Sequence, residues 1–477
     1  MALTPIKFGT DGWRATIADG YTFANLRRAV QGFATYVRRT WAWEKGILVA
    51  YDRRFGSERF ARAAAEVLAG NGIPVHLVDR PTPTPVGAFN IPAVGATGAV
   101  IITASHNPPS DNGMKVRSST GAAVEPKDLA ILEEDVAAVT ADGAKRLEFD
   151  DGVARGLINV FNPDAVYLSH VRDLVDLDAL RARNLHVVFD PMYGAGAGWL
   201  PRILEGGALR VTEIHPEWNP AFPGLARPEP IPPQTDELCR TVKQLSGSVG
   251  IATDGDADRL GVVDEKGVFL DQLRTITLLA WYFLDHRNIR KPLVRTLTTS
   301  HMLDALGRIY GVDVIETPVG MKYVAPKMAE VDAVMGGEES GGYVFAPHMP
   351  ERDGLVAGLY FLDLMARENA TPSQLVQRLF AKLGREYHYA RHDLTFPAER
   401  RAEIEARVRA WTPDRIDGSA VLRRDDIDGF KYYLDDESWL LVRFSGTEAL
   451  LRIYTETTTP KRVETLLRLG REAAGLT

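Results

Sequence analysis

Short apolar runs alternate with amphipathic stretches along most of this chain, and that alternation limits its fold to a few classes. Five aliphatic runs end in loops of Gly, Asp, Ser or Thr: residues 47–50, 99–102, 186–189, 249–252 and 331–335. Residues 23–38, 57–69 and 235–245 place apolar side chains every three or four positions, as amphipathic helices do. The pattern predicts α/β units with parallel or mixed sheets. Because such sheets bind ligands outside the carboxyl ends of their strands, we expect the functional residues in the loops that follow these runs.

The length of 477 residues predicts several domains, since single hydrophobic cores stop growing well before this size. Composition shifts at residues 141–157 and after Arg367 mark two boundaries, and a strand-like run suggests a third near Asp258. We therefore predict four domains, at residues 1–150, 151–257, 258–370 and 371–477. The order of strand and loop repeats in three of them, but their sequences differ too much to establish a duplication.

Charge and cysteine usage exclude several classes of protein. The chain has 56 Lys and Arg against 63 Asp and Glu, a net charge of −7, which excludes a basic nucleic-acid scaffold. A single cysteine, Cys239, cannot form an intramolecular disulfide and favours a reducing compartment. No apolar stretch approaches the roughly 20 residues of a membrane span, and the first residues do not resemble a secretory signal. We expect a cytoplasmic monomer or homodimer with no nucleic-acid or membrane partner.

The loop after residues 99–102 begins Thr-Ala-Ser-His-Asn-Pro-Pro and places Ser105 at the mouth of the predicted sheet. A hydroxyl in that position can act as a nucleophile or carry a phosphoryl group. Lys115, ten residues further on, could neutralise such a group. Taken alone, the same residues also suit an ordinary surface turn followed by a solvated lysine.

Asp254, Asp256 and Asp258 alternate directly after the run 249–252, so an extended backbone would project all three carboxylates to one side. Three close negative charges need a cation, and oxygen ligands alone favour a hard ion such as Mg²⁺. An EF-hand calcium loop would need glycine where this chain has Arg259, and helices where it has strand-like flanks. A solvated acidic turn is the alternative.

Residues 337–342 read Gly-Glu-Glu-Ser-Gly-Gly, and their carboxylates and hydroxyl suit the hydroxyl groups of a sugar. A glycine turn with surface acids would look the same. No Walker A sequence and no strand-linked dinucleotide fingerprint is present, so the residues suggest a metal as the only cofactor.

A fourth loop follows the predicted strand 439–442 and combines a guanidinium, two hydroxyls and a glycine that allows close backbone approach. Such a combination holds a dianionic phosphate, although a cationic surface turn is an alternative. The residues concerned are Arg443, Ser445, Gly446 and Thr447, with Arg452 nearby.

Together, these four loops resemble those of the α-D-phosphohexomutase family, in the same order along the chain. The opening residues 8–14, Phe-Gly-Thr-Asp-Gly-Trp-Arg, also look like that family's N-terminal signature. The resemblance spans nearly the whole chain and implies four domains around a central cleft. The first three would be α/β domains with mixed sheets of similar topology, and the last a smaller α+β domain. A linker near residues 371–383 would let the last domain close onto bound sugar.

The resemblance also implies a role for each matched residue. Ser105 would be the phosphorylated serine, joining Asp254, Asp256 and Asp258 in holding Mg²⁺. The catalytic group would be Ser105, His106, Lys115, Arg14 and Lys322, with Lys322, His106 and Arg14 as candidate proton donors or acceptors. The substrate-binding group would be Arg259, Gly320, Glu338, Ser340, Arg443, Ser445, Gly446, Thr447 and Arg452.

Substrate choice rests mainly on residues 317–322, Thr-Pro-Val-Gly-Met-Lys, which look like the phosphoglucomutase version of the specificity loop. The bifunctional phosphomannomutase/phosphoglucomutase branch carries histidine where Met321 and Gly342 stand, and glucosamine-type relatives carry glutamine where Glu339 stands. His348 and residues 351–354 also look like the glucose-type enzymes.

We therefore expect reversible conversion of α-D-glucose 1-phosphate into glucose 6-phosphate through bound glucose 1,6-bisphosphate. Mannose and, less favoured, glucosamine phosphates are alternative substrates. A non-catalytic protein that binds sugar phosphates is the alternative class.

Overall fold

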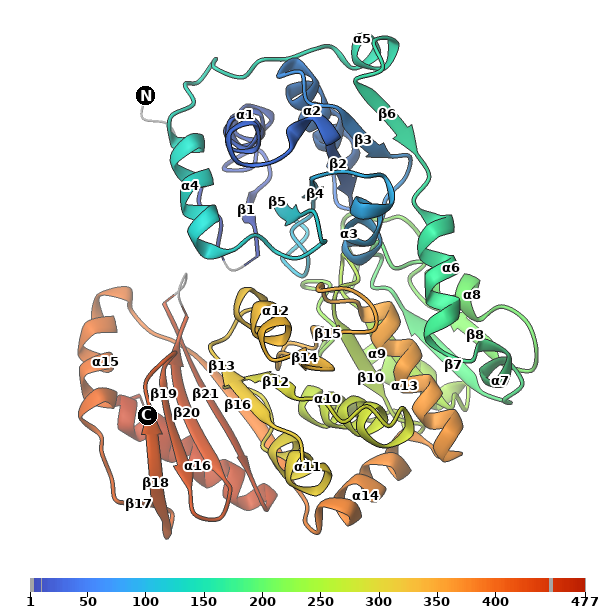
Figure 1. Cartoon of the computed structure of the whole chain (residues 1–477). Coiled ribbons are helices and arrows are strands. Elements are labelled where there is room, and N and C mark those ends of the chain that lie inside the picture. The colour runs from blue at the N-terminus through green and yellow to red at the C-terminus, as the bar shows by residue number, and fades with distance from the viewer. Residues whose placement is uncertain (1–3, 10, 446–448, 477) are drawn as a thin grey trace.

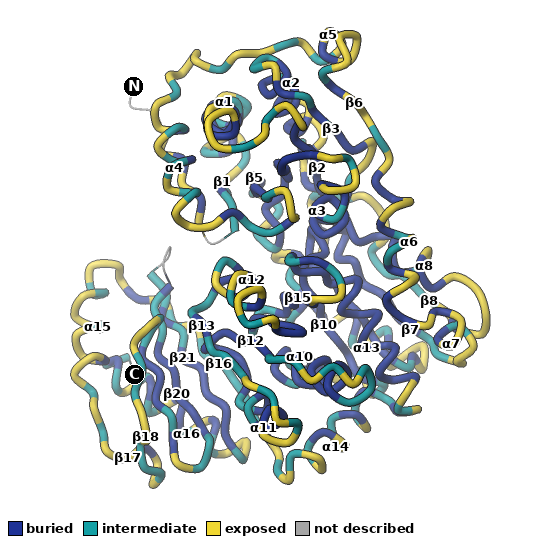
Figure 2. Tube along the Cα trace, viewed as in Figure 1, coloured by how far each residue is buried: buried dark blue, intermediate teal, exposed yellow. Residues whose placement is uncertain are grey.

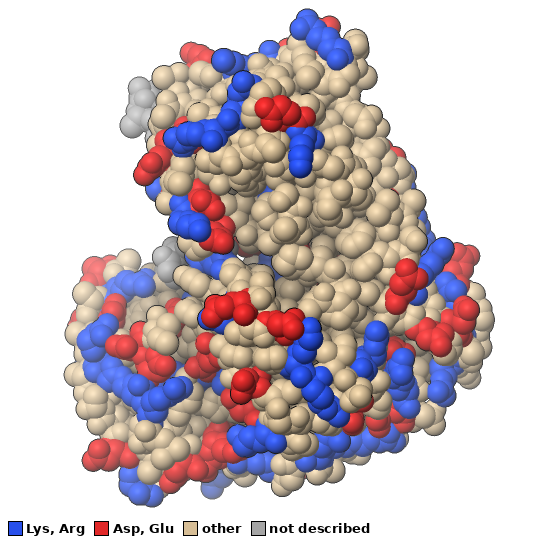
Figure 3. Space-filling model, viewed as in Figure 1, with Lys and Arg blue, Asp and Glu red and all other residues tan. Residues whose placement is uncertain are grey.

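A computed structural model describes residues 4–9, 11–445 and 449–476, which form four sheets with helices packed against them. Figure 1 shows the first domain above the second and third, and the C-terminal domain beside the third. In the space-filling view the surface is notched between the first and the C-terminal domains (Figure 3). The described helices include none that is long and apolar enough to cross a membrane.

The first domain has a six-stranded mixed sheet in the order β1-β5-β4-β2-β3-β6. Its strands are β1 (Trp13–Thr16), β2 (Ile47–Tyr51), β3 (Val75–Val78), β4 (Gly98–Ile102), β5 (Asp111–Ser118) and β6 (Ile158–Phe161). Its helices are α1 (Phe23–Thr40), η1 (Trp43–Lys45), α2 (Ser57–Gly70), α3 (Thr84–Ala93), α4 (Pro126–Ala137) and α5 (Phe149–Ala154). The strands β2 and β4 are buried throughout, which explains their unbroken aliphatic sequences.

The second domain has a five-stranded sheet in the order β11-β10-β9-β7-β8. Its strands are β7 (His186–Asp190), β8 (Arg210–Glu213), β9 (Val249–Thr253), β10 (Leu260–Val263) and β11 (Phe269–Leu270). Its helices are α6 (Asp164–Leu174), α7 (Leu177–Arg181), α8 (Trp199–Leu204) and α9 (Asp236–Gln244).

The third domain has a four-stranded sheet in the order β13-β12-β14-β15. Its strands are β12 (Leu293–Thr296), β13 (Val314–Thr317), β14 (Met335–Gly337) and β15 (Tyr343–Phe345). Its helices are α10 (Gln272–Trp281), the π-helical turn η2 (Tyr282–His286), α11 (Met302–Tyr310), α12 (Met321–Glu330), α13 (Gly354–Glu368) and α14 (Pro372–Leu383).

These three sheets share one topology, as the resemblance implied. In each, three parallel strands are followed by a fourth that returns antiparallel to the third: β2, β3, β4 and β5, then β7, β8, β9 and β10, then β12, β13, β14 and β15. The repetition that the sequence could not establish is therefore present in the fold.

The C-terminal domain has a six-stranded sheet in the order β16-β21-β20-β19-β18-β17, in which every pair is antiparallel. Its strands are β16 (His388–Thr395), β17 (Arg415–Ile416), β18 (Ser419–Asp425), β19 (Phe430–Leu434), β20 (Trp439–Phe444) and β21 (Leu450–Thr457). Its helices are η3 (Ala398–Arg400), α15 (Arg401–Ala410) and α16 (Pro460–Ala474). The α+β class implied for this domain agrees with that arrangement.

Several predicted boundaries shift once the strand pairing is known. The first sheet continues to β6, beyond residue 150, because β6 pairs with β3. The second sheet includes β10 and β11, beyond residue 257, because β10 pairs with β9. The proposed linker 371–383 is mostly the helix α14, which packs on α10, α11 and α13 of the third domain.

One predicted strand is displaced. Residues 331–334 form a turn after α12, with Asp332 at a φ of 51°, and the strand β14 begins only at Met335. Ala333 and Val334 are nevertheless buried, and a buried apolar turn between a helix and a strand has the same residue pattern as a short buried strand.

The hydrophobic core clusters do not correspond one to one with the four sheets. The first domain has its own core, whereas one cluster runs continuously through the second and third domains. Figure 2 shows the central strands buried and the outer faces of the peripheral helices exposed. The C-terminal sheet has a separate core on its helical face, while Trp439 and Leu441 on its other face join the cluster of the third domain.

Candidate active site

Three of the predicted site loops occupy the same place in three equivalent sheets. Residues 103–110 connect β4 to β5, residues 254–259 connect β9 to β10, and residues 338–342 connect β14 to β15. Each loop leaves the carboxyl end of a parallel strand and returns as its antiparallel neighbour. The shared topology therefore presents each loop at the edge of its sheet where α/β proteins bind ligands.

Ser105 is held in a strained and buried loop. Its φ of 52° lies in the left-handed region, and its side chain is 1% exposed. The guanidinium of Arg54 fixes the loop by donating hydrogen bonds to the carbonyl oxygens of Ser105 at 2.6 Å, Asn107 at 2.5 Å and Pro108 at 2.8 Å. Strain of this kind persists where the surroundings over-determine a conformation, and functional sites are common examples.

Asp254, Asp256 and Asp258 converge, and one oxygen of each lies within 4.8 Å of the others. The backbone that brings them together is a turn with Ala257 at a φ of 60°, and not the extended segment that the alternation assumed. The Ser105 hydroxyl donates a hydrogen bond to Asp254 Oδ2 at 2.8 Å, so the serine loop and the acidic loop meet. All three carboxylates are buried, and Oδ1 of Asp256 and of Asp258 has no hydrogen-bond partner among the described residues. Unpartnered carboxylate oxygens in an oxygen-only set fit a hard divalent cation.

The electrostatics of this triad also favour a bound cation. Burial, together with the charges of Asp258 and Asp256, raises the pKa of Asp254 well above its ordinary value. A bound cation would relieve that repulsion.

Lys115 is buried against the same acids. Its Nζ lies 2.7 Å from Asp256 Oδ2, 2.8 Å from Asp258 Oδ2 and 2.9 Å from Asp11 Oδ2. Burial lowers the pKa of Lys115, but the three carboxylates outweigh that effect and raise it above its ordinary value. Lys115 is therefore a fixed positive charge directly beside the triad.

Two arginines that the sequence analysis did not assign to the site complete this charge network. Arg352 donates a hydrogen bond to Asp258 at 2.7 Å, a long one to Glu338 at 3.4 Å, and another to Asp11. Arg117 donates to Asp11 at 2.8 Å and also contacts Glu351. The available signals were the N-terminal signature, which contains Asp11, and the run 351–354, but neither shows that these groups meet.

Three more predicted residues surround the serine. Arg14 Nη1 donates to the Asn107 side chain at 2.7 Å, and His106 Nδ1 lies 3.3 Å from the Ser105 hydroxyl. Arg259 is buried and donates to Glu229 at 3.2 Å. Burial lowers the pKa of His106 well below its ordinary value, and the charges of Arg259 and Arg14 add to this effect. The resulting concentration of fixed cations suits a phosphoryl group.

The loop 338–342, which the sequence predicts to bind the sugar, contributes one buried acid to this network. Glu338 is 6% exposed, and burial raises its pKa although Arg352 partly offsets the shift. Ser340 is half-buried in the same turn. Glu339 instead faces the C-terminal domain, where it accepts hydrogen bonds from Tyr389 at 2.8 Å and from Arg391 at 3.0 Å.

The specificity loop lies at the start of α12. Gly320 has a φ of 133°, a backbone conformation that strongly favours glycine, and directly precedes the helix. Met321 is buried in a core cluster of the third domain. Lys322 lies over the Tyr323 ring, 5.4 Å from its centre. No hydrogen bond or ion pair among the described residues joins Lys322 to the Ser105 loop.

The phosphate loop lies in the C-terminal domain, after β20. Arg443 Nε donates to Asp428 at 2.9 Å, and Arg452 Nε lies 3.6 Å from Asp393 Oδ2. The Ser445 carbonyl oxygen accepts a hydrogen bond from Arg401 at 2.8 Å. Gly446 and Thr447, which were also predicted for this loop, lie outside the described residues.

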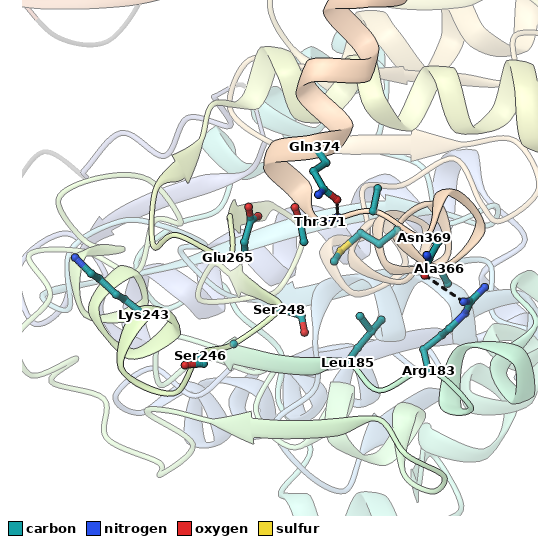
Figure 4. A pocket seen from close by; sticks show the side chains of 13 residues that line it. Arg183, Leu185, Lys243, Ser246, Ser248, Glu265, Ala366, Asn369, Thr371 and Gln374 are labelled. Carbon is teal, nitrogen blue, oxygen red and sulfur yellow. Dashed lines mark hydrogen bonds between the residues drawn. The ribbon is translucent and has the colours of Figure 1, made fainter.

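A cavity of about 440 Å³ lies elsewhere, between the second and third domains (Figure 4). Leu185 and Ser248, which precede β7 and β9, line it together with Asn369 and Thr371 between α13 and α14. It therefore opens at the edge of the second sheet opposite the loop of Asp254, and no predicted site residue lines it.

Comparisons with known proteins agree with this architecture. The four domain models of phosphoglucomutase/phosphomannomutase match in order: domain I at residues 5–142, domain II at 165–267, domain III at 271–383 and the C-terminal domain at 400–468.

Individual relatives match over nearly the whole chain. A phosphoglucomutase/phosphomannomutase of Thermococcus kodakarensis is 30% identical over 463 residues, covering 97% of each chain. A phosphoglucosamine mutase of Leifsonia xyli subsp. xyli is 30% identical over 484 residues, covering 98% of each. The crystal structure of a putative phosphomannomutase from Thermus thermophilus superposes with a TM-score of 0.86 at 32% identity, covering 99% of each chain.

The fold and the matched domains define a phosphohexomutase, an enzyme of the isomerase class. The chain belongs to the phosphoglucomutase/phosphomannomutase family of α-D-phosphohexomutases.

Proposed function

We propose that this enzyme interconverts α-D-glucose 1-phosphate and glucose 6-phosphate through a phosphoserine at Ser105 and bound glucose 1,6-bisphosphate. The observation that carries the proposal is the buried Ser105 hydroxyl, which lies 2.8 Å from Asp254 in a triad of aspartates. Lys115, Arg14 and Arg259 supply the surrounding positive charge.

The reaction consists of two phosphoryl transfers. Phosphorylated Ser105 gives its phosphoryl group to the 6-hydroxyl of glucose 1-phosphate, whose proton leaves to a base, and the serine oxygen is regenerated. The bisphosphate then turns around, and the Ser105 oxygen, which gives up its proton to a base, takes the phosphoryl group from the oxygen on C1. That oxygen gains a proton, and glucose 6-phosphate is released. Because such transfers depend on alignment and charge neutralisation, fixed cations matter more here than covalent chemistry.

Mg²⁺ is the cofactor that we assign to the triad. Asp254, Asp256 and Asp258 would hold it, with phosphorylated Ser105 as a further ligand. When bound, the ion would neutralise the charge of the transferring phosphoryl group.

His106 is the candidate proton donor or acceptor that lies in contact with the Ser105 hydroxyl, at 3.3 Å. Lys322 and Arg14 remain candidates because geometry in the substrate complex decides proton transfer. Arg443, Ser445, Gly446, Thr447 and Arg452 are proposed to bind the phosphate that does not react, and Gly320, Glu338 and Ser340 to bind the sugar.

The preference for glucose rests on the sugar and specificity loops. A side chain at Gly342 would place its Cβ 2.4 Å from Arg352 Cδ, so a histidine there, as in the bifunctional branch, would have to displace the buried Arg352 side chain. Met321 and Glu339 are weaker arguments for glucose than their sequence suggests, because Met321 lies in the core and Glu339 binds the C-terminal domain. Mannose and glucosamine phosphates, which occur in the names of relatives, are the alternative substrates.

Phosphorylation of Ser105 tests the proposed class. Incubation with glucose 1,6-bisphosphate should add one phosphate to the intact mass, and peptide mapping should place it on Ser105. The Ser105→Ala variant should show no mass gain, and its turnover should fall at least about 1,000-fold, as expected for loss of a nucleophile.

Ser110 offers a matched control, because it is an exposed serine in the same loop. Ser110→Ala should keep both the mass gain and the turnover. Stoichiometric sugar-phosphate binding by the wild-type protein without a phosphoenzyme would instead support the non-catalytic class.

A further inference from the structure

The turn between β18 and β19 places one carboxylate between the specificity loop and the phosphate loop. Asp428 Oδ1 accepts a hydrogen bond from Arg443 Nε at 2.9 Å, and Asp428 Oδ2 accepts one from the backbone N–H of Val319 at 3.0 Å. Val319 lies in the specificity loop of the third domain, whereas Arg443 and Asp428 belong to the C-terminal domain. One side chain therefore joins two predicted substrate-binding segments from different domains.

The geometry of the C-terminal sheet explains this arrangement. Trp439 and Leu441 point from β20 toward the third domain and join its core. Because side chains alternate along a strand, Arg443 projects from that same face. Gly429, next to Asp428, has a φ of 106°, and a side chain there would place Cβ 2.9 Å from the Val442 carbonyl oxygen and 3.0 Å from Arg443 Cβ. The missing side chain lets the turn close onto Arg443.

The strand that leads into the specificity loop is fixed separately. Glu316, the penultimate residue of β13, accepts a hydrogen bond from Lys431 at 2.7 Å and also contacts Tyr433 and Arg295. Lys431 also donates to the Leu297 carbonyl oxygen at 2.6 Å. These contacts hold the end of β13 against the C-terminal domain. The Asp428 contact lies beyond them, on the loop itself.

We propose that Asp428 is a positioning residue for substrate recognition, which sets the orientation of Arg443 and the position of the specificity loop together. A guanidinium held at Nε keeps a fixed plane, and phosphate binding through two parallel hydrogen bonds depends on that plane. The hydrogen bond from Val319 to Asp428 also fixes the backbone of the specificity loop, which contains Gly320 and Lys322. This inference rests on the proposed function, since it takes Arg443 and the specificity loop as substrate-binding groups.

The test is Asp428→Ala, measured by steady-state kinetics on the full-length enzyme. The KM for α-D-glucose 1-phosphate should rise about tenfold, the effect of losing one charge-assisted hydrogen bond, with a much smaller change in kcat. The ratio of kcat/KM between glucose and mannose 1-phosphates should also shift at least about threefold, because the specificity loop loses its anchor. Asp428→Asn keeps the size and one acceptor oxygen, so it should fall between wild type and Asp428→Ala.

Asp426→Ala is the matched control. Asp426 lies in the same turn with the same charge, but it pairs with Arg409, 3.4 Å away on the outer side of the domain. It should leave KM and the substrate ratio at wild-type values. Equal KM values and ratios in Asp428→Ala and Asp426→Ala would overturn the inference, whether both variants matched wild type or both were impaired.

Calorimetric titration with glucose 6-phosphate separates this inference from the proposed function. If the wild-type protein binds the sugar phosphate but shows no turnover, the proposed reaction fails. In that case, binding that is about tenfold weaker in Asp428→Ala but unchanged in Asp426→Ala would still support Asp428 as a positioning residue. Unchanged binding by Asp428→Ala would overturn the inference, whatever the turnover.

Discussion

Arg352 is a single side chain that joins three parts of the chain. It contacts Asp11 near the N-terminus, Asp258 in the loop 254–259 and Glu338 in the loop 338–342, and it is 4% exposed. Burying so many charges is costly unless each is paired. Removal of Arg352 takes the ion-pair partner from Glu338 and leaves Asp11 and Asp258 with Lys115. Arg352 therefore contributes to the stability of the site as well as to its charge.

Arg352→Met should lower the free energy of unfolding by about 3–5 kcal/mol, the range for breaking a buried ion pair, and should strongly reduce turnover. Urea denaturation followed by circular dichroism measures the first effect. Arg468→Met is the control, because Arg468 forms an exposed pair with Glu472 and should cost no more than about 0.5 kcal/mol. Equal losses in the two variants would show that Arg352 is not an essential partner.

The helix α14 is capped by a side chain from another domain. Glu265, in the turn between β10 and β11 of the second domain, accepts hydrogen bonds from the Ser373 backbone N–H at 3.3 Å and from the Ser373 hydroxyl. Ser373 lies in the first turn of α14, where backbone N–H groups lack partners within the helix. The contact thus ties the second domain to the third beside the cavity of Figure 4.

Glu265→Gln keeps one acceptor oxygen but loses the negative charge, so it should destabilise the protein by about 0.3–1 kcal/mol at pH 7, the usual value of a negative charge at a helix N-terminus. Burial raises the pKa of Glu265, but the hydrogen bonds from Ser373 outweigh it and hold the pKa below its ordinary value. The stabilisation is therefore complete above the pKa of an unfolded glutamate, about 4.3, and is lost as the pH falls through the lower folded value.

Denaturation of both proteins between pH 3 and pH 8 checks this prediction. The difference between wild type and Glu265→Gln should shrink below about pH 4. Glu464→Gln, at an exposed position of α16, is the control and should change stability little at any pH. A difference that persists at pH 3 would mean that the charge of Glu265 does not carry the effect.

Across the whole chain, three equivalent sheets each contribute one loop to the site, and the second and third share a continuous core. The C-terminal domain docks one face of its sheet on the third domain and keeps a separate core on the other. The segments that we propose to bind substrate therefore come from all four domains, and we expect no single residue to decide which sugar is accepted.

Parallel coupled assays with the 1-phosphates of glucose, mannose and glucosamine test the proposed substrate. We expect kcat/KM to be at least about tenfold higher for glucose, since one or two altered contacts at C2 are worth roughly 10–200-fold. Ser105→Ala, assayed beside the wild type, excludes a contaminating mutase. Equal specificity constants for glucose and mannose would instead assign the enzyme to the bifunctional branch.

Much of the fold could be predicted because its local signals are strong. Runs such as 47–50 and 249–252 are strands within one residue of their predicted bounds, and residues 23–38 lie within α1. Asp254, Asp256 and Asp258 do converge, but through a turn with Ala257 at a φ of 60° and not through the extended backbone that their alternation assumed. The strand predicted at 331–335 failed because an apolar sequence does not distinguish a strand from a buried turn.

The sequence by itself determined which polar loops follow which strands, and so which loops we propose to carry the chemistry, since strand period, turn residues and charge are properties of neighbouring residues. Only the tertiary structure decided which distant groups meet: Arg352 with Asp11, Glu265 with Ser373, and Asp428 with the backbone N–H of Val319. Those pairs are far apart in the chain, and their contacts follow from how whole sheets pack against one another. No local pattern encodes such packing, because its energy belongs to the assembled cores and to the burial of the charges between them.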